Sequence, residues 1–252
     1  MSYVNYSSVL LLKIGKRGDC LKSWNSDIDA CGMNSDWLSR LNDLLGPTEA
    51  YDQGLHDIVN SLRECGKITV EQGIFLWNYP DLNVVGYLAH LSKKSRYGDN
   101  VFFNSNLHVN QTNICTLACK FCAFRRGKRA KDAYALTIGE FLSRLEPFED
   151  RIDEVHTVGG LHPDWDVEYY EQLFSASKQR FPNIHIKSLS AVEVKHIAEM
   201  SGISPRDLLI RLKASGLDSL PGGGAEILDD SVREIICYGK ESSDEYIGIH
   251  RD

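Results

Sequence analysis

The chain has 252 residues, of which 42% are hydrophobic and 25% are charged. That composition is typical of a folded globular protein and excludes a disordered or collagen-like chain. Asp and Glu number 35 against 28 Lys and Arg, which gives a formal net charge of −7. An acidic balance disfavours nucleic acid or an anionic membrane as the main partner, because both attract basic surfaces. The composition therefore favours small-molecule chemistry.

The sequence contains no apolar run near the roughly 20 residues that span a bilayer. The run from Val9 to Leu12 is also shorter than the about 7–15 apolar residues of a signal-peptide core. We therefore expect a cytoplasmic protein with no membrane partner. In a reducing compartment, the seven cysteines are expected to be inert, metal-binding or catalytic rather than paired in disulfides.

Residues 1–100 are predicted to form a mainly helical region, although residues 1–35 show no clear periodicity. After residue 35, apolar side chains recur at helical spacing in successive segments. Thr69 followed by Gln72 is typical of a capping box at a helix start. The predicted helices run from Asp36 to Gly46, from Leu55 to Gly66, from Thr69 to Trp77, and from Asp81 onward.

Residues 101–252 alternate between strand and helix patterns, which indicates an α/β fold with a parallel sheet. Predicted strands begin at residues 107, 153, 184 and 217, which are 46, 31 and 33 residues apart. A (β/α) barrel of roughly 250 residues uses about 31 residues per unit. Functional residues are expected where these strands end. The predicted extended segments are Val101–Phe103, Leu107–Asn110, Asp153–Val158, Ile184–Leu189 and Leu217–Leu220.

The remaining helices of this region are marked by capping residues and apolar faces. The predicted starts are Thr137, Asp166, Val192, Ser204 and Ser243. The stretch from residue 107 to residue 252 has room for four or five barrel units rather than eight. We therefore expect a partial (β/α) barrel, truncated relative to a full one. A small complete domain with four strands is the alternative.

Three cysteines form a compact cluster in the sequence Cys-Thr-Leu-Ala-Cys-Lys-Phe-Cys, at Cys115, Cys119 and Cys122. The CxxxCxxC spacing lets one loop place three thiolates around a single inorganic centre. An electron-transfer [4Fe–4S] cluster usually has four cysteine ligands, so three would leave one iron open to a small molecule. A Cys₃His zinc site with His108 or His162 is the alternative. Zinc sites typically use two separated CxxC-like pairs, and the single triplet therefore favours iron–sulfur.

The other cysteines carry weaker signals. Cys237 lies beside Ile235 and Ile236 and is predicted to be a core residue on a helix. Cys65 is predicted to be structural at a helix end, and Cys20 and Cys31 have no ligand-like partner in the sequence.

The cluster, with aromatic Phe121 before the third cysteine, resembles the CxxxCxφC signature of the radical S-adenosylmethionine (SAM) enzymes. Other segments resemble the branch that includes aminofutalosine synthase, dehypoxanthine futalosine cyclase and the deazaflavin (FO) synthases. His162 in Gly-Gly-Leu-His-Pro and the Asn-x-His-x-Asn lead-in are most similar to aminofutalosine synthase, because the cyclase tends to have Asn in place of this histidine. The resembling segments are Asn106–Cys115, Phe121–Arg125, Val158–Asp164, Ala191–Glu193 and Leu217–Ile227.

This resemblance implies a [4Fe–4S] cluster and SAM as cofactors. In the family, the methionine part of SAM binds the open iron, and one electron splits the sulfonium into methionine and a 5′-deoxyadenosyl radical. For aminofutalosine synthase, the radical adds to 3-[(1-carboxyvinyl)oxy]benzoate to form 6-amino-6-deoxyfutalosine in menaquinone biosynthesis. The implied partners are this small-molecule substrate and a flavodoxin- or ferredoxin-like electron donor. Dehypoxanthine futalosine cyclase, or a non-catalytic iron–sulfur-binding fragment, are the alternatives.

The resemblance also implies roles for single residues besides the three cysteine ligands. Gly159 and Gly160 would let the backbone approach SAM, since glycine adopts conformations that other residues avoid. Glu226 would bind the cofactor, and Glu193 and His162 would act in catalysis. The alternatives are a plain strand-to-helix turn for the glycines, helix-entry carboxylates for the glutamates, and an ordinary turn histidine.

Overall fold

The computed structural model describes residues 33–252. The chain divides into two compact units, Met1–Phe103 and Asn104–Asp252. The expectations for residues 1–32, including Cys20 and Cys31, lie outside the described residues. Within residues 33–252, no helix combines the length and the apolar character needed to cross a membrane.

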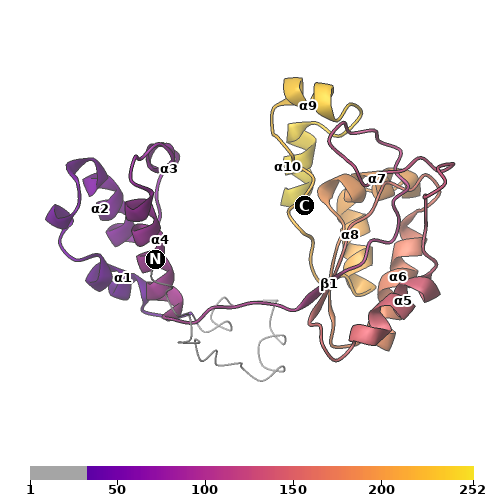
Figure 1. The fold of residues 1–252 in the computed structure, drawn as a ribbon, viewed down its shortest axis with the longest axis horizontal. Coiled ribbons are helices and arrows are strands. Elements are labelled where there is room, and N and C mark those ends of the chain that lie inside the picture. The colour runs from indigo at the N-terminus through magenta and orange to yellow at the C-terminus, as the bar shows by residue number, and fades with distance from the viewer. Residues whose placement is uncertain (1–32) are drawn as a thin grey trace, which may run out of the picture. The chain divides into compact units, whose positions relative to one another are not determined.

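The described part of the first unit is helical, as the sequence predicts (Figure 1). The Thr69 hydroxyl accepts a hydrogen bond from the Gln72 amide, and the Gln72 side chain accepts one from the Thr69 amide, which completes the predicted capping box. A core of leucine, isoleucine and valine joins the helices. The helices are α1 (Trp37–Leu45), α2 (His56–Cys65), α3 (Val70–Trp77) and α4 (Leu82–Tyr97), with short 3₁₀ turns at Thr48–Ala50 and Gln53–Leu55.

The second unit is built on a parallel sheet in the order β1-β2-β3, with helices in the connections (Figure 1). This arrangement confirms the predicted α/β class. The strands are β1 (Asn106–His108), β2 (Glu154–Thr157) and β3 (His185–Ser188). The helices are α5 (Ile138–Leu145), α6 (Val167–Arg180), α7 (Ala191–Ser201), α8 (Pro205–Ala214), α9 (Asp230–Ile236) and α10 (Ser243–Arg251), with a 3₁₀ turn at Glu146–Phe148.

Most helix starts lie where the capping residues predict them. Thr137, Asp166 and Ser204 each accept a hydrogen bond from the first turn of the helix that follows. The start of α10 is shifted by one residue, because Ser242 rather than Ser243 forms the capping box with Glu245. The sequence could not separate two adjacent serines, since either hydroxyl can cap a helix.

The predicted fourth strand, Leu217–Leu220, is wrong as a regular strand. Its link to the sheet is a single parallel bridge between Lys187 and Ser219. The Asp218 carboxylate accepts a hydrogen bond from the Ile186 amide at 2.7 Å, so a side chain takes the place of a backbone ladder partner. Pro221 then follows without an N–H to donate. The extended segment predicted at Val101–Phe103 is also outside any strand or helix.

The two faces of the sheet differ in polarity. Leu107, Val155 and Ile186 pair in register across the three strands and contact the main core of the unit. Because side chains alternate along a strand, the residues on either side of these three point to the opposite face. The helices α5 to α8 therefore cover an apolar face, and polar side chains occupy the other.

We predict that Leu212→Ala lowers the free energy of unfolding by about 2–5 kcal/mol, because it leaves a cavity in a packed core. Leu212 on α8 is fully buried, whereas Ile210 on the same helix is 59% exposed. Urea denaturation of both variants checks this. Ile210→Ala should change stability by less than about 0.5 kcal/mol, and equal losses from the two variants would contradict this description of the core.

Candidate functional site

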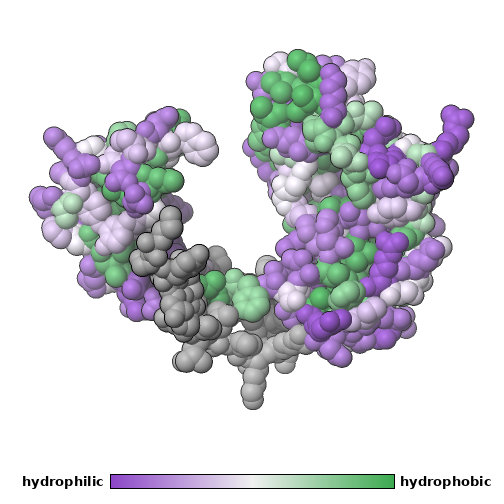
Figure 2. All heavy atoms as spheres, in the orientation of Figure 1, coloured by the Kyte–Doolittle hydropathy of each residue, from purple (hydrophilic) through white to green (hydrophobic). Residues whose placement is uncertain are grey.

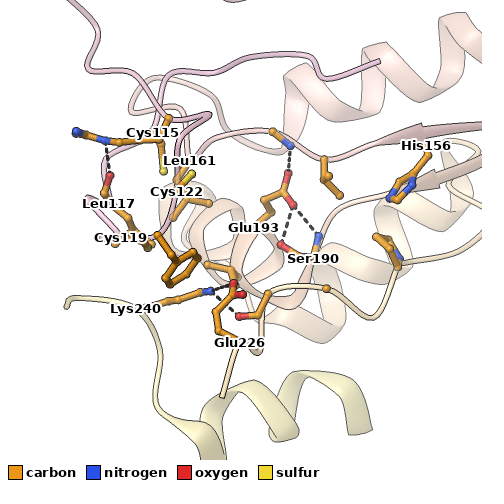
Figure 3. Close-up of a pocket in the computed structure, with 18 residues that line it drawn as sticks. Cys115, Leu117, Cys119, Cys122, His156, Leu161, Ser190, Glu193, Glu226 and Lys240 are labelled. Carbon is orange, nitrogen blue, oxygen red and sulfur yellow. Dashed lines mark hydrogen bonds and ion pairs between the residues drawn. The ribbon is translucent and has the colours of Figure 1, made fainter. Parts of the chain in front are cut away.

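A cavity of about 400 Å³ opens in the second unit where the strands end and the loops begin. The loop after β1 contributes the three clustered cysteines, and the loop after β2 contributes Val158 and Gly159. The segment after β3 adds Ser190 and Glu193, and the chain before and after α9 adds Glu226 and Lys240 (Figure 3). This is the position at which parallel α/β folds place their active sites.

The cysteine loop is held by hydrogen bonds from the backbone. The Cys115 amide donates to the Arg126 carbonyl at 3.0 Å, and the Lys120 amide donates to the Ile236 carbonyl at 2.7 Å. The Arg125 side chain crosses the loop and donates to the Leu117 carbonyl at 2.8 Å. These contacts keep the loop open around the cavity.

The donor set at this cavity fits an iron–sulfur cluster better than a zinc ion. Three half-buried thiols, those of Cys115, Cys119 and Cys122, line one cavity. Zinc at about 2.3 Å from each sulfur would bring the sulfurs to about 4 Å from one another. Nowhere in residues 33–252 are three His, Cys, Asp or Glu side chains arranged to hold a single ion. In a cubane cluster, each thiolate binds a different iron, so the sulfurs stand farther apart.

The two histidines predicted as the fourth ligand of a zinc site lie elsewhere. Neither His108 nor His162 is among the residues that line the cavity. Cys237 is buried, as predicted for a core residue, although it follows the last residue of α9 rather than lying on a helix. Cys65 at the end of α2 is exposed and belongs to the first unit.

A buried cation lies beside the cysteines. Burial raises the pKa of the Cys119 thiol, and the ammonium group of Lys240 opposes this effect. The Lys240 side chain is 5% exposed, and its Nζ lies 2.9 Å from the Glu226 carboxylate while also donating to the Gly224 carbonyl. A nearby cation favours the thiolate forms that bind metal.

Sequence reasoning missed Lys240, because it lies 118 residues after Cys122 and no local pattern links them. Its position depends on Arg233, which is buried and donates to the backbone carbonyls of Ile227 and Glu241. The Arg233 guanidinium also pairs with the buried Glu241 carboxylate at 3.2 Å. The Arg233 side chain therefore joins the two ends of the segment that carries Glu226 and Lys240.

Gly160 lies where the turn after β2 contacts the cysteine loop. A side-chain Cβ at Gly160 would lie 2.2 Å from the Ile114 carbonyl oxygen and 2.9 Å from the Cys115 Cβ. Gly159 lines the cavity, and its amide donates to the Glu193 carboxylate at 2.8 Å. The glycines therefore have a packing reason of their own, and their predicted contact with SAM stays a prediction.

Glu193 is buried and its carboxylate is held by the chain itself. It accepts hydrogen bonds from the Ser190 amide at 2.7 Å, from the Ser190 hydroxyl at 2.8 Å and from the Gly159 amide at 2.8 Å (Figure 3). The Gln111 amide group donates at 3.4 Å. Burial raises the pKa of Glu193, and these hydrogen bonds oppose the rise. The contacts favour a positioning role, and its predicted part in catalysis stays a prediction.

Glu226 is brought to the cavity in an unusual backbone conformation. Its φ of +57° lies in the left-handed region, which is uncommon for residues other than glycine and is often found at functional sites. The contact with Lys240 fixes the direction of its carboxylate. Its predicted cofactor role is untested by these contacts, although the structure places it in the same cavity as the cysteines.

His162 packs away from the cavity. Its ring is stacked on Trp165 at a centroid distance of 4.2 Å, and its Nδ1 accepts a hydrogen bond from the Asp164 amide. Burial lowers the pKa of this imidazole. The structure thus does not bring His162 to the cysteines, and its predicted catalytic role stays a prediction. A different histidine, His156 on β2, lines the cavity and was missed from the sequence.

Residues 109–252 match the model of the Radical SAM superfamily. The chain belongs to this superfamily. It is 38% identical to the aminodeoxyfutalosine synthase of Streptomyces coelicolor over 202 residues, which are 79% of this chain and 52% of that protein. It is also 36% identical over 207 residues to the cyclic dehypoxanthine futalosine synthase of the same organism, with coverages of 80% and 51%. The chain therefore spans about half the length of these curated relatives.

A solved structure shares the fold of this radical SAM protein. The crystal structure of HydG, a maturase of the [FeFe]-hydrogenase, superposes with a TM-score of 0.58 at 15% sequence identity. The match covers 85% of this chain and 49% of that chain. The predicted family resemblance and fold class are thus confirmed.

We predict that Gly160→Ala destabilises the second unit by about 1–3 kcal/mol, because the added methyl group forces the Ile114 backbone away. The same shift moves Cys115, so reconstitution should yield less iron per chain. Gly222→Ala is the matched control, since a Cβ there meets no atom within 4 Å. Urea denaturation and iron analysis check both variants, and a Gly160→Ala protein as stable and as iron-rich as the control would contradict the described contact.

Proposed function

We propose that this chain provides the cluster- and SAM-binding part of an aminofutalosine synthase. The carrying observation is that three cysteines and the Glu226–Lys240 pair line one cavity at the strand ends. The similarity to aminodeoxyfutalosine synthase over most of this chain supports the choice of reaction. The proposed acceptor is 3-[(1-carboxyvinyl)oxy]benzoate, and the proposed product is 6-amino-6-deoxyfutalosine, a step of menaquinone biosynthesis in the cytoplasm.

Cys115, Cys119 and Cys122 would hold a [4Fe–4S] cluster at the cavity. When bound together with SAM, the cluster supplies the one-electron cleavage that produces the 5′-deoxyadenosyl radical. A flavodoxin- or ferredoxin-like protein would deliver the electron. The protein itself binds and orients the reactants, since such cofactors carry the difficult chemistry.

The polar residues of the cavity complement the charges of SAM, which carries an ammonium and a carboxylate on its methionine part. The Glu226 carboxylate would face the ammonium of SAM, and the Lys240 ammonium would face its carboxylate. Gly159 would let the backbone approach SAM closely. The Glu193 carboxylate would hold the Gly159 turn in place through its hydrogen bond. Cavity walls of Leu117, Phe121, Val158, Leu161 and Val192 would exclude water from a reactive radical.

We predict that Cys119→Ala abolishes cluster assembly while most of the helix content remains. Removing one thiolate leaves two ligands, which is too few to retain the cubane. Cys65→Ala is the matched control, since Cys65 is exposed in the other unit. Iron and sulfide analysis after anaerobic reconstitution, with far-ultraviolet circular dichroism, measures both effects. Undiminished iron in Cys119→Ala would argue against a three-thiolate site.

We predict that the reconstituted and reduced protein converts SAM and 3-[(1-carboxyvinyl)oxy]benzoate to 6-amino-6-deoxyfutalosine, which mass spectrometry identifies. Dehypoxanthine futalosine is tested in parallel as the substrate of the alternative cyclase. Cyclised product from that substrate alone would favour the cyclase. Release of 5′-deoxyadenosine from SAM without either product would overturn the proposed acceptor, and an intact cluster that cleaves no SAM would indicate a non-catalytic fragment.

A further inference from the structure

The face of the sheet opposite the helices carries polar side chains in register. His108 pairs with His156 across β1 and β2, and His156 pairs with Lys187 across β2 and β3. Paired residues of parallel strands point to the same face, so these three side chains form one continuous line, here called the polar row. Barrel interiors are usually filled by Val, Ile and Leu. Two imidazoles and an ammonium group at such positions therefore need an explanation.

Two members of the polar row stack on each other, and the third is paired with a carboxylate. The rings of His108 and His156 stack at a centroid distance of 4.9 Å and an angle of 20°. The Lys187 Nζ lies 3.0 Å from the buried Glu154 carboxylate. Burial is the main cause that lowers the pKa of His156, and the charges of His108 and Lys187 lower it further. The Glu154 carboxylate opposes this shift. His156 is thus held in its neutral form near pH 7.

Two side-chain polar atoms near the end of β1 and on β2 are buried without a hydrogen-bond partner. Among the described residues of the second unit, these are His156 Nε2 and Asn110 Oδ1. His156 belongs to the polar row, and Asn110 lies two residues after the last residue of β1. Buried polar groups in folded proteins nearly always have a partner. A bound molecule with polar groups would supply the missing ones.

The cavity reaches from the cysteine loop to this unpartnered imidazole. His156 is one of the lining residues, and in Figure 3 it lies on the opposite side of the drawn residues from Cys115, Cys119 and Cys122. A molecule bound at His156 therefore shares the cavity with the group that the cysteines hold. This is where the acceptor of a radical must lie.

We propose that the acceptor substrate binds beside the polar row through a carboxylate, with His156 Nε2–H as its hydrogen-bond donor and the Lys187 ammonium as a nearby positive charge. The inference rests on the proposed radical SAM function and adds to it the residues that select an acidic acceptor. Lys187 Nζ lies 3.0 and 3.1 Å from the two Glu154 carboxylate oxygens and is not among the residues that line the cavity, so it would act on the ligand through its positive charge. The His108 ring holds the His156 ring in orientation by stacking. Hydrogen bonds to a charged carboxylate are stronger than neutral ones, so one such contact can determine specificity.

The test uses the full chain after anaerobic reconstitution, with His156→Phe and Lys187→Met as variants and Lys213→Met as control. Phenylalanine keeps the stacked ring and removes Nε2, and Lys213 is exposed on α8. We expect His156→Phe to raise the KM for 3-[(1-carboxyvinyl)oxy]benzoate at least tenfold and Lys187→Met to raise it by a smaller factor. Iron content should stay at the wild-type level, which separates this effect from misfolding. Lys213→Met should match the wild type.

A second measurement compares the acid with its carboxamide analogue by calorimetry on the wild type and the variants. The wild type should bind the analogue at least tenfold more weakly than the acid, and His156→Phe should reduce this preference. An unchanged KM and an unchanged preference in both variants would overturn the polar row as the acid-binding site. If the wild type binds the acid but forms no product, the proposed reaction fails while the binding site stands. If the wild type does not bind the acid, the inference fails as well.

Discussion

The architecture of the site depends on one close approach between two stretches of backbone. The turn after β2 passes so near to Ile114 that residue 160 has no room for a side chain. Backbone hydrogen bonds fix this contact on both sides, from the Gly160 amide to the Thr112 carbonyl and from the Thr116 amide to the Leu161 carbonyl, each at 3.0 Å. Through Gly159 and the buried Glu193 carboxylate, the same turn is tied to the start of α7. The position of the cysteine loop is therefore set by its contacts with the turn after β2, which is in turn bonded to the start of α7.

The two faces of the sheet in the second unit differ in polarity, one forming the hydrophobic core and the other part of the candidate site. The apolar face of the sheet packs under α5 to α8, and this core is built from side chains of the strands and these helices. The other face and the strand ends carry His156, Glu193, Glu226 and Lys240, each of which is held by a neighbouring strand or loop. On the face of the second unit that Figure 2 shows, hydrophilic and hydrophobic residues are interspersed. A rigid scaffold with polar groups along one edge can orient a reactive group and its acceptor together.

The sequence correctly predicted the elements whose stabilising contacts join residues close together in the chain. The helices α3, α5 and α8 begin at the hydroxyl residues expected to cap them, because a cap is satisfied within four residues. The Leu217–Leu220 prediction failed because strand pairing depends on a distant partner, and there the Asp218 side chain takes up the Ile186 amide. The cysteine triplet was predictable because all three cysteines lie in one short loop.

The rest of the site depends on contacts between residues far apart in the sequence. Lys240 reaches the cysteines only through the segment that Arg233 folds back. His156 could have been noticed from the polar residues at alternate positions of its strand, where Glu154 and His156 flank Val155. Its lack of a hydrogen-bond partner, however, is visible only in the folded chain. The stacking of His162 on Trp165 is equally a property of the fold, and no motif predicts it.

The central claim is that three thiolates hold a cluster with one iron left open for SAM. Electron paramagnetic resonance of the anaerobically reconstituted and reduced protein, recorded with and without SAM, tests it most directly. We expect a [4Fe–4S] signal whose g values shift when SAM is added, because SAM would bind the iron that has no cysteine ligand. A signal that stays unchanged on addition of SAM, or a protein that takes up zinc and no iron, would contradict it.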